Sequence, residues 1–452
     1  MTDLLALADH VTSKGLDAGA DEIEVFVQRA KIMEVSLKRN DMQSGQSIIS
    51  SGLGIRAIKN HGLAFSAINQ LDENQGKKAA EQVVKMVKKS PPSPHYALPE
   101  SQPLTHVPGL YDSQSESFSI DDVLDHALQL LNTAKDYDKR ITIDSGGFAA
   151  VVGERAIVTS KGIEAIEKIS GFTWYLSGMA IDGTDIGSFD FEMDSAINIS
   201  DINVEPTAEL FSKKVLSALG AKKIKSFKGP ILLTPYSTAN LVLSPILFST
   251  NAENIQKGMS RFAGQQGTQV ASDQLIISDN GTRPGELGSS RFDREGQPPQ
   301  PLTLIDKGFF KDIMFHAFSG NRVNRPSTGH ASGSYRSAPG ISATNIKLHP
   351  GDSSQSEIIS EIKHGILATR LSGGPHPLSG DFSAVVKGGM LIQNGEIQHA
   401  VKELIIQGNV YETLGSISLI SNETRKLANV GASGGSTLEA PYIVLDDVSI
   451  TS

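Results

Sequence analysis

Prolines cluster in one stretch of this chain and divide it. Six of the 20 prolines lie within residues 91–108. Because proline lacks a backbone N–H and has a fixed φ, this density is incompatible with a helix interior or a central strand and favours an extended linker. The sequence therefore predicts a first folded unit over residues 1–90 and a connection over residues 91–110.

The segment before the linker combines alternating and helical patterns. Apolar residues alternate with polar ones over residues 22–28 and again over residues 33–37, which predicts two half-buried strands. The turn Asn60-His61-Gly62 separates two further apolar runs and predicts a hairpin. Apolar residues at four-residue spacing predict a helix over residues 73–89. Residues 1–90 are therefore predicted to form an N-terminal α/β domain.

Two more helices frame a strand-rich stretch after the linker. Ser119 followed by aspartates is typical of a helix N-terminus and predicts a helix that ends near residue 135. Residues 141–202 are rich in strand-forming residues, and Pro206 is placed to begin a helix that ends near residue 219. These patterns predict a central α/β domain over residues 111–228.

From residue 229 onward the composition is strand-like and rich in glycine. One helix is expected over residues 356–364. Strands are expected near residues 302–305, 384–392, 404–406 and 417–420. We therefore predict a β-rich C-terminal domain over residues 229–452. The fold class predicted for the whole chain is α+β, with N-terminal α/β domains built on mixed sheets followed by the β-rich domain.

The composition excludes several kinds of chemistry. The chain carries 41 Lys and Arg against 50 Asp and Glu, a formal net charge of −9. This balance indicates a solvated acidic surface and argues against a nucleic-acid partner, which would need clustered basic charge. Cysteine is absent, which excludes disulfides, thiolate zinc sites, Fe–S clusters and a cysteine nucleophile. Any catalysis or metal binding would have to use oxygen and nitrogen groups.

Export and membrane insertion are not indicated either. The start of the chain carries Asp3 where a secretion signal needs basic residues, and its apolar run stops at Ala8. The most apolar later stretch, residues 231–248, is interrupted by Pro235 and Pro245 and is too broken for a membrane span. We therefore expect a cytoplasmic protein without a membrane partner.

Familiar catalytic motifs are absent or stand in the wrong context. Residues 52–57 match GxGxxA, but they alternate as a strand, whereas the glycines of a dinucleotide site must open a helix. Residues 431–435 match GxSxG, but a nucleophile elbow needs a downstream histidine and none follows. P-loop and HExxH motifs do not occur. A metal site assembled from His330, His376 and Asp381 stays open as an alternative to ordinary loop or surface roles.

Two loops are dense in glycine and small polar residues. They cover residues 327–334 and residues 372–381. Glycine permits close backbone approach and positive φ, so such loops can line a groove for a peptide or a phosphate. Ordinary turns between strands are an equally good interpretation of the same composition.

Motifs in the second half of the chain resemble the third domain of the TldD/PmbA family. These motifs are Asp279-Asn280-Gly281, the run Arg291-Phe292-Asp293-Arg294-Glu295-Gly296, residues 303–308, Ser327-Thr328-Gly329 and Gly380-Asp381-Phe382-Ser383. The N-terminal strands, Gly54-Ile55-Arg56 and the proline-rich connection look like that family's first two domains through weaker motifs. The resemblance covers nearly the whole chain.

The resemblance also distinguishes two kinds of chain. TldD-type chains carry zinc on an HExxxH helix and have a late cysteine, while PmbA chains, also called TldE, lack both and pair with TldD. Here the helix expected after Pro235 covers residues 240–249 without a histidine or glutamate, and the late cysteine would fall near Val430 or Gly434. The chain therefore resembles the PmbA/TldE type, with no catalytic residue and no metal ligand of its own.

This resemblance implies a subunit of a cytoplasmic heterodimeric zinc metallopeptidase that degrades or processes unfolded proteins and small peptides. A TldD-type partner would hold the zinc. Peptide contact is expected at the two glycine-rich loops, through Thr328, His330, His376 and Asp381, beside a strand edge that can pair with an extended backbone. A large interface is expected through the domain after residue 229, with a two-fold homodimer when the partner is absent. The alternatives are a stand-alone homodimeric peptide-binding protein and a hydrolase with an unrecognised site.

Overall fold

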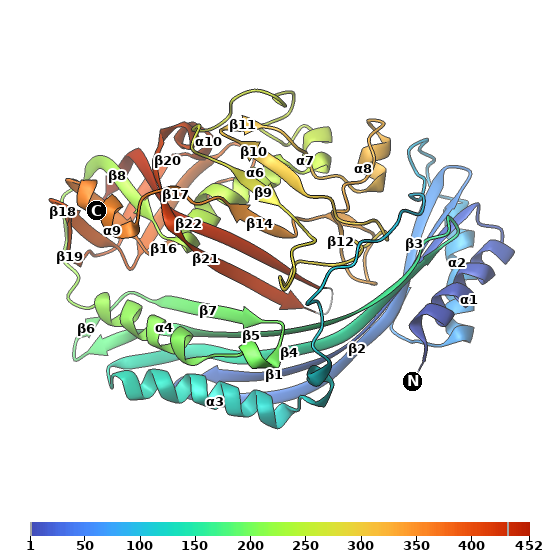
Figure 1. The fold of residues 1–452 in the computed structure, drawn as a ribbon, viewed down its shortest axis with the longest axis horizontal. Coiled ribbons are helices and arrows are strands. Elements are labelled where there is room, and N and C mark those ends of the chain that lie inside the picture. The colour runs from blue at the N-terminus through green and yellow to red at the C-terminus, as the bar shows by residue number, and fades with distance from the viewer. Residues whose placement is uncertain (1, 432–433) are drawn as a thin grey trace.

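The computed structural model describes residues 2–431 and 434–452 and contains two large sheets (Figure 1). The first sheet has seven strands in the order β3-β2-β1-β4-β5-β6, with β7 also paired to β5. Its strands are β1 (Glu22–Lys38), β2 (Asp41–Lys59), β3 (Gly62–Ile68), β4 (Ile141–Thr159), β5 (Glu164–Asp182), β6 (Asp185–Ile186) and β7 (Asp190–Ala196). All of these pairings are antiparallel. Since β1 pairs with both β2 and β4, the segments before and after the proline-rich stretch share one sheet.

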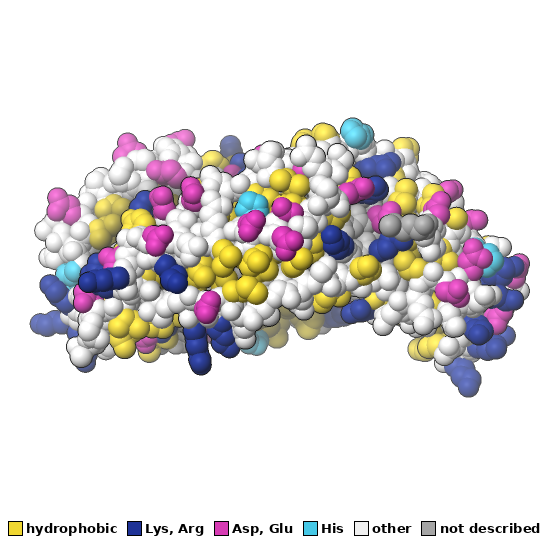
Figure 2. Space-filling view, turned by 90° about the horizontal axis from the view of Figure 1, so that it is seen from below, with side chains coloured by type: hydrophobic (Ala, Val, Ile, Leu, Met, Phe, Trp, Pro, Cys, Tyr) yellow, Lys and Arg dark blue, Asp and Glu magenta, His cyan; other side chains and the backbone are white. Residues whose placement is uncertain are grey.

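Helices cover one face of the first sheet, in two pairs. The helices α1 (Leu4–Asp17) and α2 (Glu73–Val87) pack on Ile23, Val25 and Val27 of β1. The helix α3 (Ile120–Tyr137) packs with α4 (Glu205–Ser217) over Met33, Val35 and Leu37 of the same strand. Figure 2 views the molecule from below, from the side on which α3 and α4 lie in Figure 1, and hydrophobic side chains gather in the middle of the view. The other face of the sheet is turned toward the C-terminal part of the chain.

The two strands expected at residues 22–28 and 33–37 form a single strand, β1. The alternation stays in phase between them, because Arg29 and Lys31 continue the same face of the strand. Arg29 pairs with Glu154 on β4, and the ammonium group of Lys31 donates a hydrogen bond to a backbone carbonyl at residue 118. The break in apolar character therefore marks the gap between the two helix pairs rather than a turn.

Local signals in the first half are confirmed. The hairpin of β2 and β3 turns at Asn60 and His61, both with positive φ. Helix α3 begins with a capping box, in which the Ser119 side chain accepts from the Asp122 backbone and the Asp122 carboxylate accepts from Ser119. The expected helices over residues 73–89 and 206–219 are α2 and α4.

The proline-rich connection contains neither helix nor strand, and it packs against the C-terminal part of the chain. Tyr96 stacks on Phe318 with ring centroids 4.8 Å apart. The backbone carbonyl of Pro108 accepts from the N–H of Gly285. The Gln297 amide donates to the Glu100 carbonyl. The connection thus lies along the boundary between the two sheets.

The second sheet is larger and mixed. Its main path is β11-β10-β9-β14-β22-β8-β15-β18-β19, with a branch formed by β16, β17 and β20, and with β21 on β22. Its strands are β8 (Phe227–Leu233), β9 (Ile277–Asp279), β10 (Leu302–Asp306), β11 (Phe309–Phe310), β14 (Asn345–Leu348), β15 (His364–Ala368), β16 (Arg370–Ser372), β17 (Asp381–Lys387), β18 (Met390–Gln393), β19 (Glu396–Ala400), β20 (Leu404–Asn409), β21 (Ile417–Gly431) and β22 (Gly434–Thr451). Parallel pairs occur between β14 and β22 and between β8 and β15. The predicted α+β class is confirmed.

The expectation of one strand over residues 384–392 is wrong, because β17 and β18 are separate strands with different partners. β17 pairs with β16 and β20, whereas β18 pairs with β15 and β19. Gly388 lies between them with φ of +64°, a conformation that glycine adopts without a steric cost. The short helix expected at residues 356–364 is α9 (Gln355–Glu361). Within the described residues, no helix is long and apolar enough to cross a membrane.

Candidate functional site: a cleft between the two sheets

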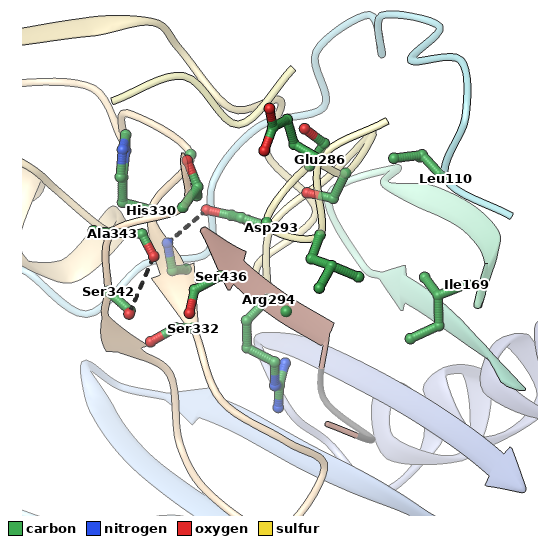
Figure 3. Close-up of a pocket in the computed structure, with 18 of the residues that line it drawn as sticks. Leu110, Ile169, Glu286, Asp293, Arg294, His330, Ser332, Ser342, Ala343 and Ser436 are labelled. Carbon is green, nitrogen blue, oxygen red and sulfur yellow. Dashed lines mark hydrogen bonds between the residues drawn. The ribbon is translucent and has the colours of Figure 1, made fainter. Parts of the chain in front are cut away.

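A cleft of about 300 Å³ lies where the first sheet meets the loops of the C-terminal part (Figure 3). Arg155 of β4 and Ile169 of β5 contribute to one wall. The other wall consists of segments that are rich in glycine and serine, the last of them at the start of β22: residues 286–290, 293–294, 329–333, 342–344 and 435–436. Three regions that are distant in the sequence therefore build one hollow.

The motif over residues 291–296 turns sharply at the base of this cleft. The carboxylate of Asp293 accepts hydrogen bonds from the backbone N–H groups of Glu295 at 2.8 Å, Gln297 at 2.9 Å and Ala331 at 2.9 Å. Burial, and then the nearby charge of Glu295, raises the pKa of Asp293 to about 7. Asp293 thus joins the motif to the glycine-rich loop that contains Ala331.

A buried charge cluster joins the motif to the first sheet. Arg56 of β2 donates from Nη2 to Glu24 of β1 at 2.5 Å and from Nη1 to Glu295 at 2.6 Å. Arg294 donates from Nη1 to the second oxygen of Glu24 at 2.8 Å, and its side chain points away from Asp293 and His330 in Figure 3. All four side chains are at most 6% exposed. We call Glu24, Arg56, Arg294 and Glu295 the charge cluster.

Two of the predicted peptide-contact residues, Thr328 and His330, lie together at the cleft wall that residues 329–333 form. The Nδ1 atom of His330 is 2.9 Å from both the hydroxyl and the carbonyl of Thr328. Its Nε2 atom is 3.3 Å from Asp279 of β9, which also accepts from the backbone N–H groups of Thr344 and Asn345. The pKa of Asp279 is lowered because these groups and His330 outweigh its burial. The His330 imidazole is fully buried, so in this structure it supports the loop rather than facing solvent.

The other two lie in a separate exposed segment, with His376 in the turn before β17 and Asp381 as the first residue of β17. The His376 backbone N–H donates to the Asp381 carbonyl at 2.8 Å. The Asp381 carboxylate accepts from the Asn409 amide at 2.9 Å, and bonds to Asn409 and Ser379 lower its pKa. No hydrogen bond or ion pair recorded for the described residues joins this turn to the pair Thr328 and His330. The structure therefore forms two local groups from the four predicted residues.

Sequence reasoning missed the partners of the charge cluster on the first sheet. The sequence pattern places Arg56 inside a glycine-containing strand and assigns no role to Glu24. Both stand opposite each other in the register of β1 and β2. A signal was available, because opposite charges within two otherwise apolar strands need a buried partner.

The residues present do not fit a zinc ion. The chain from Pro235 to Ser249 forms α5 (Pro235–Thr238), a π-helical turn (Ala239–Leu243) and α6 (Ser244–Ser249). Its polar side chains are hydroxyls and the amide of Asn240, which are poor zinc ligands. Across residues 2–431 and 434–452, no group of three or more His, Cys, Asp or Glu side chains is arranged to hold a metal ion. The serine of the GxSxG match, at position 433, lies outside the described residues.

Comparison with known proteins defines the class of this architecture, a three-part metallopeptidase-type chain. Family models described as PmbA/TldA metallopeptidase domain 1, central domain and C-terminal domain match residues 23–87, 114–219 and 226–452. The chain belongs to the PmbA/TldD metallopeptidase family. The family resemblance read from the motifs is therefore confirmed.

Individual relatives agree with this assignment. The uncharacterized protein MJ0231 of Methanocaldococcus jannaschii is 27% identical over 86% of this chain and 89% of its own length. The metalloprotease PmbA homolog of Haemophilus influenzae is 23% identical over 91% and 90%. The crystal structure of TldE from Thermococcus kodakarensis has the same fold, with a TM-score of 0.89, 24% identity and coverage of 99% and 100%. The Haemophilus influenzae relative supports a PmbA-type member, and the Thermococcus kodakarensis structure shows that the fold is shared.

Proposed function

We propose that this chain is the non-catalytic subunit of a cytoplasmic two-chain zinc metallopeptidase that degrades or processes unfolded proteins and small peptides. Its family supports peptide hydrolysis as the reaction. The observation that carries the non-catalytic role is the donor set of residues 235–249, which offers hydroxyls and one amide where a zinc helix would need histidine and glutamate. A TldD-type partner would supply the zinc and the base that activates water.

The contribution of this chain would be to hold and enclose the peptide. His376 and Asp381 stand on an exposed turn and can meet a ligand directly. Thr328 and His330 would act indirectly, by supporting the loop. The Thr328 hydroxyl accepts from the Phe315 backbone N–H at 2.8 Å and also contacts His330. They would position the backbone of residues 329–333 at the cleft.

The decisive experiment compares the chain alone with the chain mixed with a TldD-type protein from the same cell. Denatured protein and short peptides serve as substrates, and zinc is measured in both samples by mass spectrometry. We expect cleavage only by the mixture, abolished by a chelator, with zinc recovered in the partner. Stoichiometric tightly bound zinc or chelator-sensitive cleavage in this chain alone would favour the stand-alone hydrolase and contradict the proposal.

The peptide-contact residues are tested in the same mixture. His376→Ala should lower kcat/KM by about 2- to 10-fold, the effect of losing one hydrogen bond to substrate, while assembly stays unchanged. His106→Ala, at an exposed histidine of the proline-rich connection, serves as a matched surface control. Unchanged cleavage by His376→Ala would mean that residues 372–381 form only a turn.

A further inference from the structure

One edge of the first sheet is only half occupied. β2 pairs with β1 along its whole length, but on its other side β3 pairs only with Leu53–Lys59. No described strand pairs with the outer side of residues 42–51. In an antiparallel pair, alternate residues direct their N–H and C=O groups to the outer side. This part of β2 therefore presents a row of backbone groups that can accept a further strand.

The open edge is accessible and apolar. Side chains of residues 42–49 are exposed on both faces of the sheet. Among them Met42 is 42%, Ile48 47% and Ile49 72% exposed. The whole run from Met42 to Ile55 contains no charged residue and no proline.

Such an edge is unusual within this molecule. Sheet edges are ordinarily protected by charge, by proline or by short length. Among the described strands β21 pairs only with β22, and it carries Glu423, Arg425 and Lys426. β19, at the end of the second sheet, is five residues long and begins with Glu396. Residues 42–51 of β2 have none of these protections, although Ile48 and Ile49 lie among them.

The dimensions of the gap suit one extended segment. It is bounded at one end by β3 and at the other by the turn at Arg39 and Asn40, both with positive φ. An extended chain rises about 3.3 Å per residue, so roughly ten residues would fill it.

The side chain of Gln46 lies on the face that is turned toward the second sheet and donates to Glu34. Glu34 in turn lines an apolar hollow of about 480 Å³ together with Tyr175, Phe191 and Met193.

We propose that residues 42–51 of β2 bind an extended, largely uncharged peptide as an additional strand of the first sheet, in line with β3. This inference rests on the proposed function, since it names the surface on which an unfolded substrate would be held. Recognition would come from the backbone of the peptide, so it would tolerate many sequences but reject proline and charge. A folded partner is not required, because the gap accepts a single strand.

The test uses a fluorescent ten-residue peptide of alternating valine and threonine, with lysine at both ends for solubility. Two further versions are N-methylated at every odd or every even residue, which removes the N–H donors on one side of the strand. Fluorescence anisotropy with the full chain should show binding of the parent peptide. One methylated version should bind about tenfold or more weakly, and the other should bind as the parent does, since only one side faces β2.

Variants of the chain locate the site. Ile48→Lys should weaken binding of the lysine-flanked peptide, whereas Ile397→Lys, at an isoleucine on β19 that is 46% exposed, should leave it unchanged. No binding of the parent peptide, equal binding of both methylated versions, or an unchanged affinity of Ile48→Lys would overturn the inference. Conversion of a dimer to a monomer by Ile48→Lys would also overturn it, because the edge would then be occupied by a second copy. Cleavage by the mixture with the TldD-type protein tests the proposed function separately, so either proposal can fail alone.

Discussion

At the residue scale, the charge cluster decides how the two sheets meet. Glu24 and Arg56 come from the first sheet, and Arg294 and Glu295 come from the motif at the base of the cleft. A buried charge is costly without a partner, and each carboxylate here has at least one guanidinium within hydrogen-bond distance. The cluster therefore specifies which face of β1 and β2 meets the motif.

Arg56→Met should strongly destabilise the protein. The substitution leaves Glu295 without its guanidinium partner and Glu24 with only Arg294, and breaking a buried pair costs about 3 to 5 kcal/mol. Urea unfolding followed by circular dichroism measures the loss. Arg140→Met, which breaks partly exposed pairs with Asp138 and Asp182, is the control and should leave the midpoint nearly unchanged. Equal midpoints for both variants would show that the cluster does not stabilise the fold.

His316 gives stability a dependence on pH. Its Nδ1 atom accepts from the Ser319 backbone N–H at 3.2 Å and caps the short helix α8 (Ala317–Asn321), while Nε2 lies 3.1 Å from Glu253. Nδ1 can accept this hydrogen bond only when it is unprotonated. Burial is the main reason that the pKa of His316 is lowered. As the pH is lowered, this histidine takes up a proton near pH 6.5 in the unfolded chain but only at a lower pH in the folded one. The free energy of unfolding should therefore fall below pH 6.5. His316→Asn keeps a capping oxygen and should lose less stability than the parent between pH 6.5 and 5 in thermal melts; identical losses would contradict this role.

At the scale of single elements, Gly388 separates β17 from β18. A Cβ atom at this position would lie 3.2 Å from both the Asp190 carboxylate and the Thr369 side chain, and its φ of +64° disfavours any other residue. Gly388→Ala should therefore cost about 1 to 3 kcal/mol. Gly415→Ala is the matched control, since nothing lies within 4 Å of its added Cβ. Denaturant midpoints of the two variants provide the measurement, and an unshifted Gly388→Ala would mean that the break has another cause.

At the scale of the whole molecule, the chain exposes apolar side chains at several places after residue 229. They include Phe309, Val323, Leu378 and Ile405. We expect this part to bury more than about 2,000 Å² against a TldD-type partner, as obligate interfaces do. Light scattering of the chain with and without the partner tests this expectation, and the homodimer expected in the partner's absence would appear in the sample that lacks the partner. A monomer that the partner leaves unchanged would count against it.

The division of the chain at residues 90, 110 and 228 remains a prediction.

What the sequence alone determined are the features that depend on neighbouring residues. The capping box of Ser119, the turn at Asn60 and the alternation of β1 were readable because each rests on contacts within a few positions. The family was readable for a different reason, since its motifs are short and contiguous.

The tertiary structure decided everything that joins distant segments. It placed His330 in the cleft wall and His376 on another turn, although both loops are dense in glycine and small polar residues. It brought Glu24 to Arg294 across 270 positions of the chain, and it left one half of the β2 edge open because β3 ends at Ile68. Local patterns carry no information on such contacts, because they depend on how separately formed elements pack together and on which backbone groups remain unpaired.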